Sequence, residues 1–194
     1  MLITDLLRQN ALQYPDESAL VSIDSKNLDL NRQGSYEACR RALSWQQFDA
    51  MANRIANYLI QIGVRRGSKV GIMMMNRIEY LPLFFGILRA GAVSTQINFR
   101  YRPAEFAKAA ELTDIEVLFF DASSQATVTE ARPSLPQLHT CVFLGEGSCG
   151  DAAAWEEVLR VPDGDPGIPL NREDDAAIYF SSGTTGAPKA VVHS

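Results

Sequence analysis

Cysteine and histidine are scarce in this chain, and their scarcity limits the kinds of site it can build. The 194 residues include three cysteines, Cys39, Cys141 and Cys149. No two of them form a C-x-x-C pair, so a structural zinc site is not indicated. The two histidines, His139 and His193, lie too far apart in the sequence to form a local metal-binding pair. We therefore expect no structural zinc site and no local histidine metal site, and scattered cysteines of odd number are typical of reduced thiols in a cytoplasmic protein.

Basic runs and long apolar runs are also missing. Lysine and arginine total 18 against 23 aspartates and glutamates, for a net charge of −5, and no basic cluster indicates a nucleic-acid partner. The longest apolar stretch, residues 81–88, is well short of the ~20 residues that cross a bilayer, so no transmembrane segment is expected. The first five residues have neither the basic region nor the cleavage site of a signal peptide. These features together predict a cytoplasmic protein.

The residues that are present predict an α/β fold. Hydrophobic residues make up 46% of the chain and charged residues 21%, which is ordinary for one domain with a substantial core. Apolar runs that indicate strands alternate with segments of helical periodicity, so we predict a mostly parallel sheet flanked by helices on both faces. The predicted strands are residues 19–23, 69–75, 92–97, 116–121, 138–144 and 178–180. The predicted helices follow residue 4 and residue 103 and cover residues 45–62, 77–89, 123–131 and 152–159.

Several helix ends carry recognisable signals. Ser44 and Gln47 have the spacing of a capping box at the start of the long helix, and Gly63 is placed to end it. Thr4 is predicted to cap the first helix, and Asn76 the helix that follows the methionine-rich strand. These signals predict element boundaries that a structure can check.

Residues 178–192 are the most informative stretch of the chain. Three apolar residues are followed by a run of hydroxyls and glycines and then by a β-branched pair, which predicts a strand, an exposed loop and a second strand. Gly183 and Gly186 permit positive φ and close approach of a ligand. Successive N–H groups in such a turn can form an anion-binding concavity, and Lys189 supplies a compact cation suited to phosphate. Hydroxyl donors come from Ser181, Ser182, Thr184 and Thr185. The loop is therefore predicted to bind a polyphosphate.

This loop is not a Walker A loop, which requires G-x-x-x-x-G-K-[ST] at the start of a helix. Pro188 precedes Lys189, and Ala190 stands where a Mg²⁺-binding serine or threonine would be needed. Val191 and Val192 then favour a strand over a helix.

Residues 181–189, Ser-Ser-Gly-Thr-Thr-Gly-Ala-Pro-Lys, closely resemble the signature phosphate loop of the adenylate-forming (AMP-binding) superfamily. That superfamily includes acyl-CoA synthetases, peptide-synthetase adenylation domains and luciferases. Ala190 departs from the signature, where glycine is commoner. The blocks Leu-Arg-Ala-Gly-Ala-Val at residues 88–93 and Asn-Phe-Arg at 98–100 look more like stand-alone acyl-CoA synthetases than peptide-synthetase domains. An ordinary surface turn rich in serine, threonine and glycine is the alternative, and a match of this length disfavours it.

The resemblance implies a function and a set of ligands. The implied enzyme is an ATP-dependent acyl-CoA synthetase that activates a carboxylic acid as acyl-AMP and transfers it to coenzyme A. ATP, Mg²⁺ and coenzyme A are the expected cofactors, with Thr184 as the candidate direct ligand of the metal. No catalytic residue is assigned within this chain. The implied ATP phosphate-binding residues are Ser181, Ser182, Gly183, Thr184, Thr185, Gly186 and Lys189.

The resemblance also implies a domain organisation. Residues 1–194 match a partial N-terminal AMP-binding domain that stops just after the phosphate loop, and residues 24–41 are expected to form a hairpin or loop excursion. The expected partners are therefore a carboxylic acid, ATP, coenzyme A and the C-terminal remainder of the same enzyme. The chain alone is expected to be inactive. The alternative is a non-catalytic nucleotide-binding or interaction module derived from this family.

Overall fold

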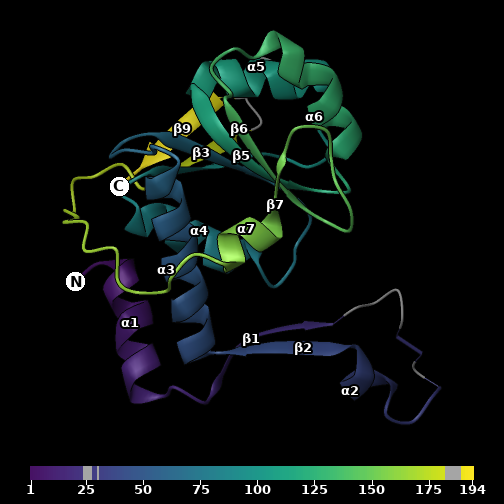
Figure 1. Ribbon diagram of the computed structural model, residues 1–194, viewed down its shortest axis with the longest axis vertical. Helices are drawn as coiled ribbons and strands as arrows, with labels where there is room; N and C mark the ends of the chain where they lie inside the picture. The colour runs from purple at the N-terminus through teal and green to yellow at the C-terminus, as the bar shows by residue number, and fades with distance from the viewer. Residues whose placement is uncertain (24–27, 30, 182–188) are drawn as a thin grey trace.

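The computed structural model describes residues 1–23, 28–29, 31–181 and 189–194. Its centre is a sheet with helices on both faces, and a smaller two-stranded ribbon extends from one end (Figure 1). Within the described residues the main sheet has seven strands in the order β7-β6-β5-β3-β4-β8-β9. These strands are β3 (Lys69–Met73), β4 (Val93–Gln96), β5 (Ile115–Asp121), β6 (Thr140–Leu144), β7 (Ala153–Ala154), β8 (Ala177–Ser181) and β9 (Lys189–His193).

The main sheet is parallel except at one edge. Neighbouring strands run parallel from β7 across to β8, whereas β9 pairs with β8 in the antiparallel direction. The α/β class predicted from the alternation of strand and helix patterns is therefore confirmed. The helices that accompany these strands are α3 (Trp45–Gln61), α4 (Tyr80–Arg89), α5 (Pro103–Thr113), α6 (Gln125–Ala131) and α7 (Trp155–Leu159), and a 3₁₀ turn follows α6 at Arg132–Ser134.

Two separate cores cover the two faces of the sheet. Successive residues of a strand point to opposite faces, so Ile72 and Phe119 join one core while their neighbours Met73 and Phe120 join the other. The first core packs against α3, α4 and α7, and the second against α5 and α6. Figure 1 shows the same division of helices between the faces. This burial on both sides explains why the central strands are nearly continuous apolar runs.

The described residues before α3 form a smaller unit beside that helix. β1 (Ser18–Ile23) and β2 (Arg40–Ser44) pair antiparallel, and the short helix α2 (Ser35–Cys39) precedes β2. α1 (Ile3–Gln13) lies against α3, where Leu7 packs with Phe48 and Ala52. In the stretch 24–41, which was expected to be a hairpin or loop excursion, the described residues include α2 and the first two residues of β2.

Both predicted signals at the ends of α3 are confirmed. The backbone N–H of Gln47 donates to Ser44 Oγ at 3.3 Å, and the N–H of Ser44 donates to Gln47 Oε1 at 2.9 Å. The reciprocal bonds are those of a capping box, and they satisfy donors that the helix itself leaves free. Gly63, just past the other end, has φ of +91°.

Two predicted caps are wrong. α1 begins at Ile3, ahead of Thr4, because the carboxylate of Asp5 accepts the N–H of Leu2 at 2.8 Å and so caps the helix earlier. Asn76 does not cap α4, whose first residue is Tyr80. The chain between Asn76 and Tyr80 makes a turn instead, in which the N–H of Tyr80 donates to the carbonyl of residue 77 at 3.1 Å.

Candidate functional site

The carboxyl edge of the sheet is where the topology predicts a ligand site. β3, β4, β5, β6 and β8 are parallel, so their C-terminal ends lie at one edge. From β3 the chain passes to β4 on one side and then returns to β5 on the other side of β3. In open α/β sheets, ligands bind outside the carboxyl ends of the strands, close to such a reversal.

The strands that flank the predicted phosphate-loop segment are β8 and β9, here called the hairpin, and the end of β8 lies at this edge. Ser181, the last residue of β8, is the register partner of Lys189, the first residue of β9. Both side chains are exposed. Ser182, Gly183, Thr184, Thr185 and Gly186 lie outside the described residues. The predicted strand on each side of the loop is present, and the phosphate-binding roles remain predictions.

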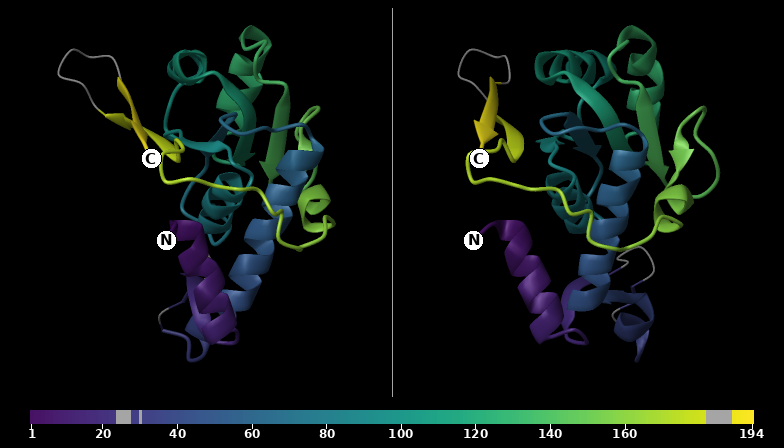
Figure 2. Two further views of the ribbon diagram at one scale, coloured as in Figure 1. Left: turned by 90° about the vertical axis from the view of Figure 1, so that its left-hand side faces the viewer. Right: turned by 60° about the vertical axis from the view of Figure 1, so that its left-hand side comes forward.

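The hairpin is held to the rest of the sheet near its base. β8 pairs with β4 at two positions, Ser94 with Ala177 and Thr95 with Ile178. Further along, the ring of Phe180 meets that of Tyr101 edge to face, with centroids 6.4 Å apart. Figure 2 shows the hairpin leaning away from the other strands.

A partly buried group of hydrogen-bonded polar side chains, not foreseen from the sequence, lies beside the hairpin. Tyr80 Oη donates to Gln96 Oε1 at the carboxyl end of β4, and Gln96 Nε2 donates to Ser94 Oγ at 2.7 Å. Burial raises the pKa of Tyr80, and the nearby Tyr179 adds to the rise. The phenol is therefore a hydrogen-bond donor and not a base. The available sequence signal was a glutamine at the end of an otherwise buried strand.

An ion-pair cluster lies in the turn between β3 and α4. Arg77 Nε is 2.7 Å from Glu79 Oε2, and its Nη1 donates to the carbonyl of Leu144 at 2.8 Å, at the end of β6. Arg41 Nη2 reaches the other carboxylate oxygen of Glu79 at 3.1 Å. Burial alone raises the pKa of Glu79, but Arg77, with help from Arg41, holds the pKa below its ordinary value. Both oxygens of this carboxylate are engaged, so the cluster stabilises the edge and supplies no free base.

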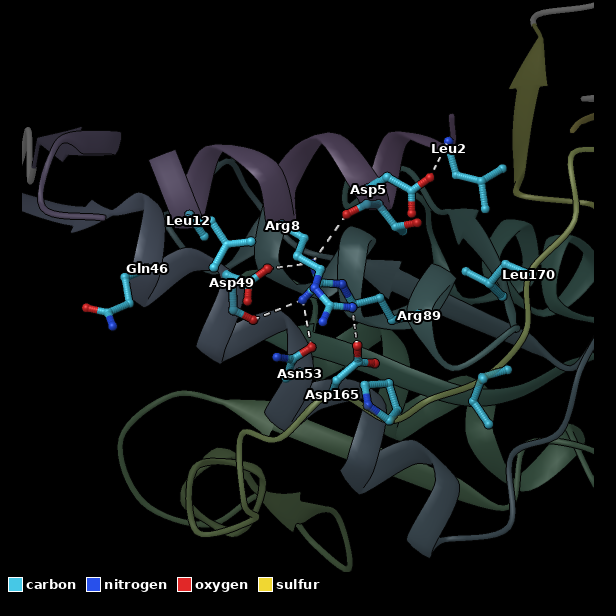
Figure 3. Close-up of a pocket in the computed structure, with 14 residues that line it drawn as sticks. Leu2, Asp5, Arg8, Leu12, Gln46, Asp49, Asn53, Arg89, Asp165 and Leu170 are labelled. Atoms are coloured by element: carbon cyan, nitrogen blue, oxygen red, sulfur yellow. Dashed lines mark hydrogen bonds and ion pairs between the residues drawn. The ribbon is translucent and has the colours of Figure 1, made fainter. Parts of the chain in front are cut away.

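A pocket between α1, α3 and residues 165–170 holds a second set of charged groups (Figure 3). Arg89 donates to Asn53 Oδ1 at 2.7 Å and to Asp49 Oδ1 at 2.5 Å. Arg8 pairs with Asp165 at 2.5 Å on the outer side. These charged groups pair with one another, and the pairs join α1, α3, α4 and residues 165–170.

The described part of the chain contains neither a metal-binding cluster nor a membrane-spanning helix. Within residues 1–23, 28–29, 31–181 and 189–194, no three His, Cys, Asp or Glu side chains come together in a way that could hold a metal ion. In the same part of the chain, no helix is long and apolar enough to cross a membrane.

Comparison with known proteins defines the class of the molecule. Residues 7–194 match the AMP-binding enzyme family, and the chain belongs to that family. The resemblance recognised in the phosphate-loop segment is thereby confirmed at the level of the family.

Individual relatives narrow the comparison. The chain is 31% identical to a medium/long-chain-fatty-acid–CoA/3-oxocholest-4-en-26-oate–CoA ligase of Mycobacterium marinum, with 98% of this chain and 33% of the relative aligned. An anthranilate CoA ligase solved with anthranoyl-AMP matches at a TM-score of 0.85 and 27% identity, over 98% of this chain and 34% of that one. The inhibitor-bound N-terminal domain of FACL13 from Mycobacterium tuberculosis matches at 0.80 and 27%, over 98% and 44%. The chain thus spans about a third of the length of the curated relative, and corresponds to the N-terminal part of such ligases.

Proposed function

We propose that this chain supplies the ATP phosphate-binding part of an acid–thiol ligase that forms AMP and pyrophosphate. The observation that carries the proposal is the pairing of Ser181 with Lys189 at the carboxyl edge of the sheet. This pairing holds the two ends of the glycine- and hydroxyl-rich segment together at the edge where α/β sheets bind ligands. Membership of the AMP-binding enzyme family supports the same assignment.

The chemistry explains why such a loop is needed. A carboxylate is a poor acyl donor, so one of its oxygens first attacks the α-phosphorus of ATP, forming acyl-AMP and releasing pyrophosphate. The thiol of coenzyme A then attacks the acyl carbon, loses its proton and displaces AMP. Negative charge develops on the departing pyrophosphate, and fixed donors and cations aimed at it lower the barrier.

Different residues of the segment contribute to neutralising the phosphate charge. The exposed ammonium of Lys189 makes no ion pair with the described part of the chain, so it is available to the β- and γ-phosphates. The hydroxyls and N–H groups of residues 181–186 would donate to the same oxygens. Mg²⁺ enters as the ATP complex and neutralises phosphate charge. A hydroxyl oxygen is a hard donor of the kind this ion accepts, and Thr184 is the candidate ligand.

The substrate is proposed as a class. The curated relative named above acts on medium- and long-chain fatty acids and a sterol carboxylate. We propose a fatty or related carboxylic acid here, activated in the cytoplasm. The three free, buried cysteines suit that compartment.

Nucleotide titration of the purified chain tests the proposal. Isothermal titration with Mg-ATP and with AMP should show tighter binding of ATP, because the contacts are to the β- and γ-phosphates. Lys189→Ala should weaken ATP binding about tenfold, the effect of losing one charged hydrogen bond. Lys108→Ala removes another exposed lysine, from α5, and should leave binding unchanged. Equal ATP affinities for the two variants would count against the proposal.

An activity assay separates the ligase from the non-catalytic alternative. The 194-residue chain alone is expected to form no acyl-AMP. Joined to the C-terminal two-thirds of a relative such as the M. marinum ligase, it should support carboxylate-dependent exchange between ATP and pyrophosphate. Nucleotide binding without exchange in the joined protein would favour a nucleotide-binding module.

A further inference from the structure

The connection that leads into the proposed site is long and has no regular structure. Residues 160–176, here called the strap, join the end of α7 to the start of β8 and contain neither helix nor strand. Figure 1 shows the strap running from α7 past α3 to β8. Such a segment takes its course from the side chains that hold it.

The sheet itself constrains β8 weakly. Besides the two register pairs with β4, the N–H of Ser94 donates to the carbonyl of Ala176 at 2.9 Å. Beyond Ile178, β8 pairs only with β9 among the described residues. The direction in which the hairpin leaves the sheet therefore depends on how the strap enters β8.

Side-chain amides of α3 hold the first half of the strap. Asn57 Nδ2 donates to the carbonyls of Pro162 and Gly164, at 2.9 and 2.8 Å. Asn53 Nδ2 donates to the carbonyl of Asp163 at 3.0 Å. The two asparagines are four residues apart, so they lie on one side of α3. Three successive carbonyls of the strap are thus fixed to this helix.

Arg66 holds the second half of the strap. Its Nη1 donates to the carbonyl of Pro169 at 3.1 Å, and its Nη2 donates to both carboxylate oxygens of Asp174. Asp174 also accepts the N–H of Asn171 at 2.8 Å and lies three residues before β8. One planar guanidinium therefore fixes the strap at two points immediately before the hairpin.

We infer that Arg66 is a positioning residue for the nucleotide site: it fixes the strap and so sets the direction in which β8 and β9 carry Ser181 and Lys189. The inference rests on the proposed function for its consequence in binding. Its structural part, the control of the hairpin by Arg66, stands on the contacts above. The hydrogen bond from Arg66 also lowers the pKa of Asp174.

Arg66→Ala tests the inference, with Arg65→Ala as the matched control. Arg65 is the exposed neighbour, and its side chain makes no hydrogen bond or ion pair with the described residues. Arg66→Ala should increase amide hydrogen exchange in β8 and β9 and leave that of β3 and β5 unchanged. It should also weaken ATP binding at least threefold, roughly. Because the Arg66 side chain is 44% exposed, little loss of overall stability is expected.

Exchanging the two residues of the Arg66–Asp174 ion pair should restore the order of the hairpin. Arg66→Asp combined with Asp174→Arg should restore slow exchange in the hairpin to a level that neither single substitution reaches. The inference is overturned if Arg66→Ala behaves like Arg65→Ala, or if it raises exchange equally in every strand. If the unaltered chain binds no ATP, the proposed function fails, while the exchange data still decide whether Arg66 controls the hairpin.

Discussion

The guanidinium of Arg89, at the C-terminal end of α4, lies against the carboxylate of Asp49 in α3, with Nη2 2.5 Å from Oδ1. Arg89 is 8% exposed and also donates to Asn53 Oδ1 and to the carbonyl of Thr4. One arginine thereby links α1, α3 and α4. In the sequence it belongs to the block at residues 88–93 that suggested an acyl-CoA synthetase, and its structural contribution is to join helices.

Removing the carboxylate partner should be costly. Asp49→Ala leaves a buried guanidinium without its counter-charge, and losing one partner of a buried ion pair costs roughly 3–5 kcal/mol. We expect a loss of about 3 kcal/mol, since Asp49 is 20% exposed. Asp165→Ala is the control in the same pocket, where both partners are more than half exposed and the loss should stay below about 1 kcal/mol. Urea unfolding measures the loss of unfolding free energy in each variant. Similar losses for Asp49→Ala and Asp165→Ala would contradict the role of Asp49 as partner of a buried charge.

Gly86 allows α4 to lie close to α3. A Cβ added there would lie 2.6 Å from Ile55 Cγ2 and 2.8 Å from the carbonyl oxygen of Ala52. We expect Gly86→Ala to destabilise the fold by about 1–3 kcal/mol, the usual cost of overpacking. Gly164→Ala is the control, because a Cβ at that position meets nothing within 4 Å. The melting temperature of Gly164→Ala should lie within a few degrees of that of the unaltered chain. A stable Gly86→Ala variant would show that the two helices can separate at little cost.

The Arg77–Glu79–Arg41 cluster predicts a pH dependence. The pKa of Glu79 is lower in the folded chain than its ordinary value of 4.5. Its carboxylate therefore contributes stability above pH 4.5, and the contribution is lost as the pH falls through the folded-state pKa. Glu79→Gln should lower stability at neutral pH by about 1–3 kcal/mol, and the difference should shrink on acidification below pH 4.5. Glu130→Gln alters an exposed glutamate of α6 and should show no such trend. A difference that stays constant down to pH 3 would refute the role of the cluster.

Cys141 should be unreactive in the folded chain. It is 2% exposed, and burial raises the pKa of its thiol to about 11. At pH 8 only about one such thiol in a thousand is ionised, and the thiolate is the reactive form. A chain in which Cys39 and Cys149 are replaced by serine reports on Cys141 alone. Labelling by a disulfide reagent should be slow in buffer and fast in guanidinium chloride. Equal rates in the two conditions would show that the site opens readily.

Local patterns in the sequence were enough to predict most of the fold. The apolar runs around Ile72 and Phe119 predicted strands, and the Ser44–Gln47 spacing predicted the start of α3. The predicted start of α4 was wrong partly because a contact between residues far apart in the sequence acts there. Glu79, just before that helix, pairs with Arg41, which comes from a different strand pair.

The candidate site, like the fold, was predictable from the sequence only in part. The strand on each side of the loop followed from apolar residues, and the pairing of Ser181 with Lys189 follows from a hairpin. The contact between Arg66 and Asp174 joins residues 108 apart in the chain, and no local pattern marks it. Within the strap, the prolines, glycines and aspartates of residues 162–169 predict only a loop. Its role depends on partners that the fold brings together.

β9 is the outermost strand of the described sheet, and one of its edges has no neighbour there. Val191 and Val192 are 42% and 51% exposed, and no charged residue lies between Lys189 and His193. Unpaired N–H and carbonyl groups beside exposed valines form a template onto which another copy of the strand can add. Concentrated solutions of the chain should therefore assemble edge to edge, and a lysine in place of Val192 would keep the molecules apart.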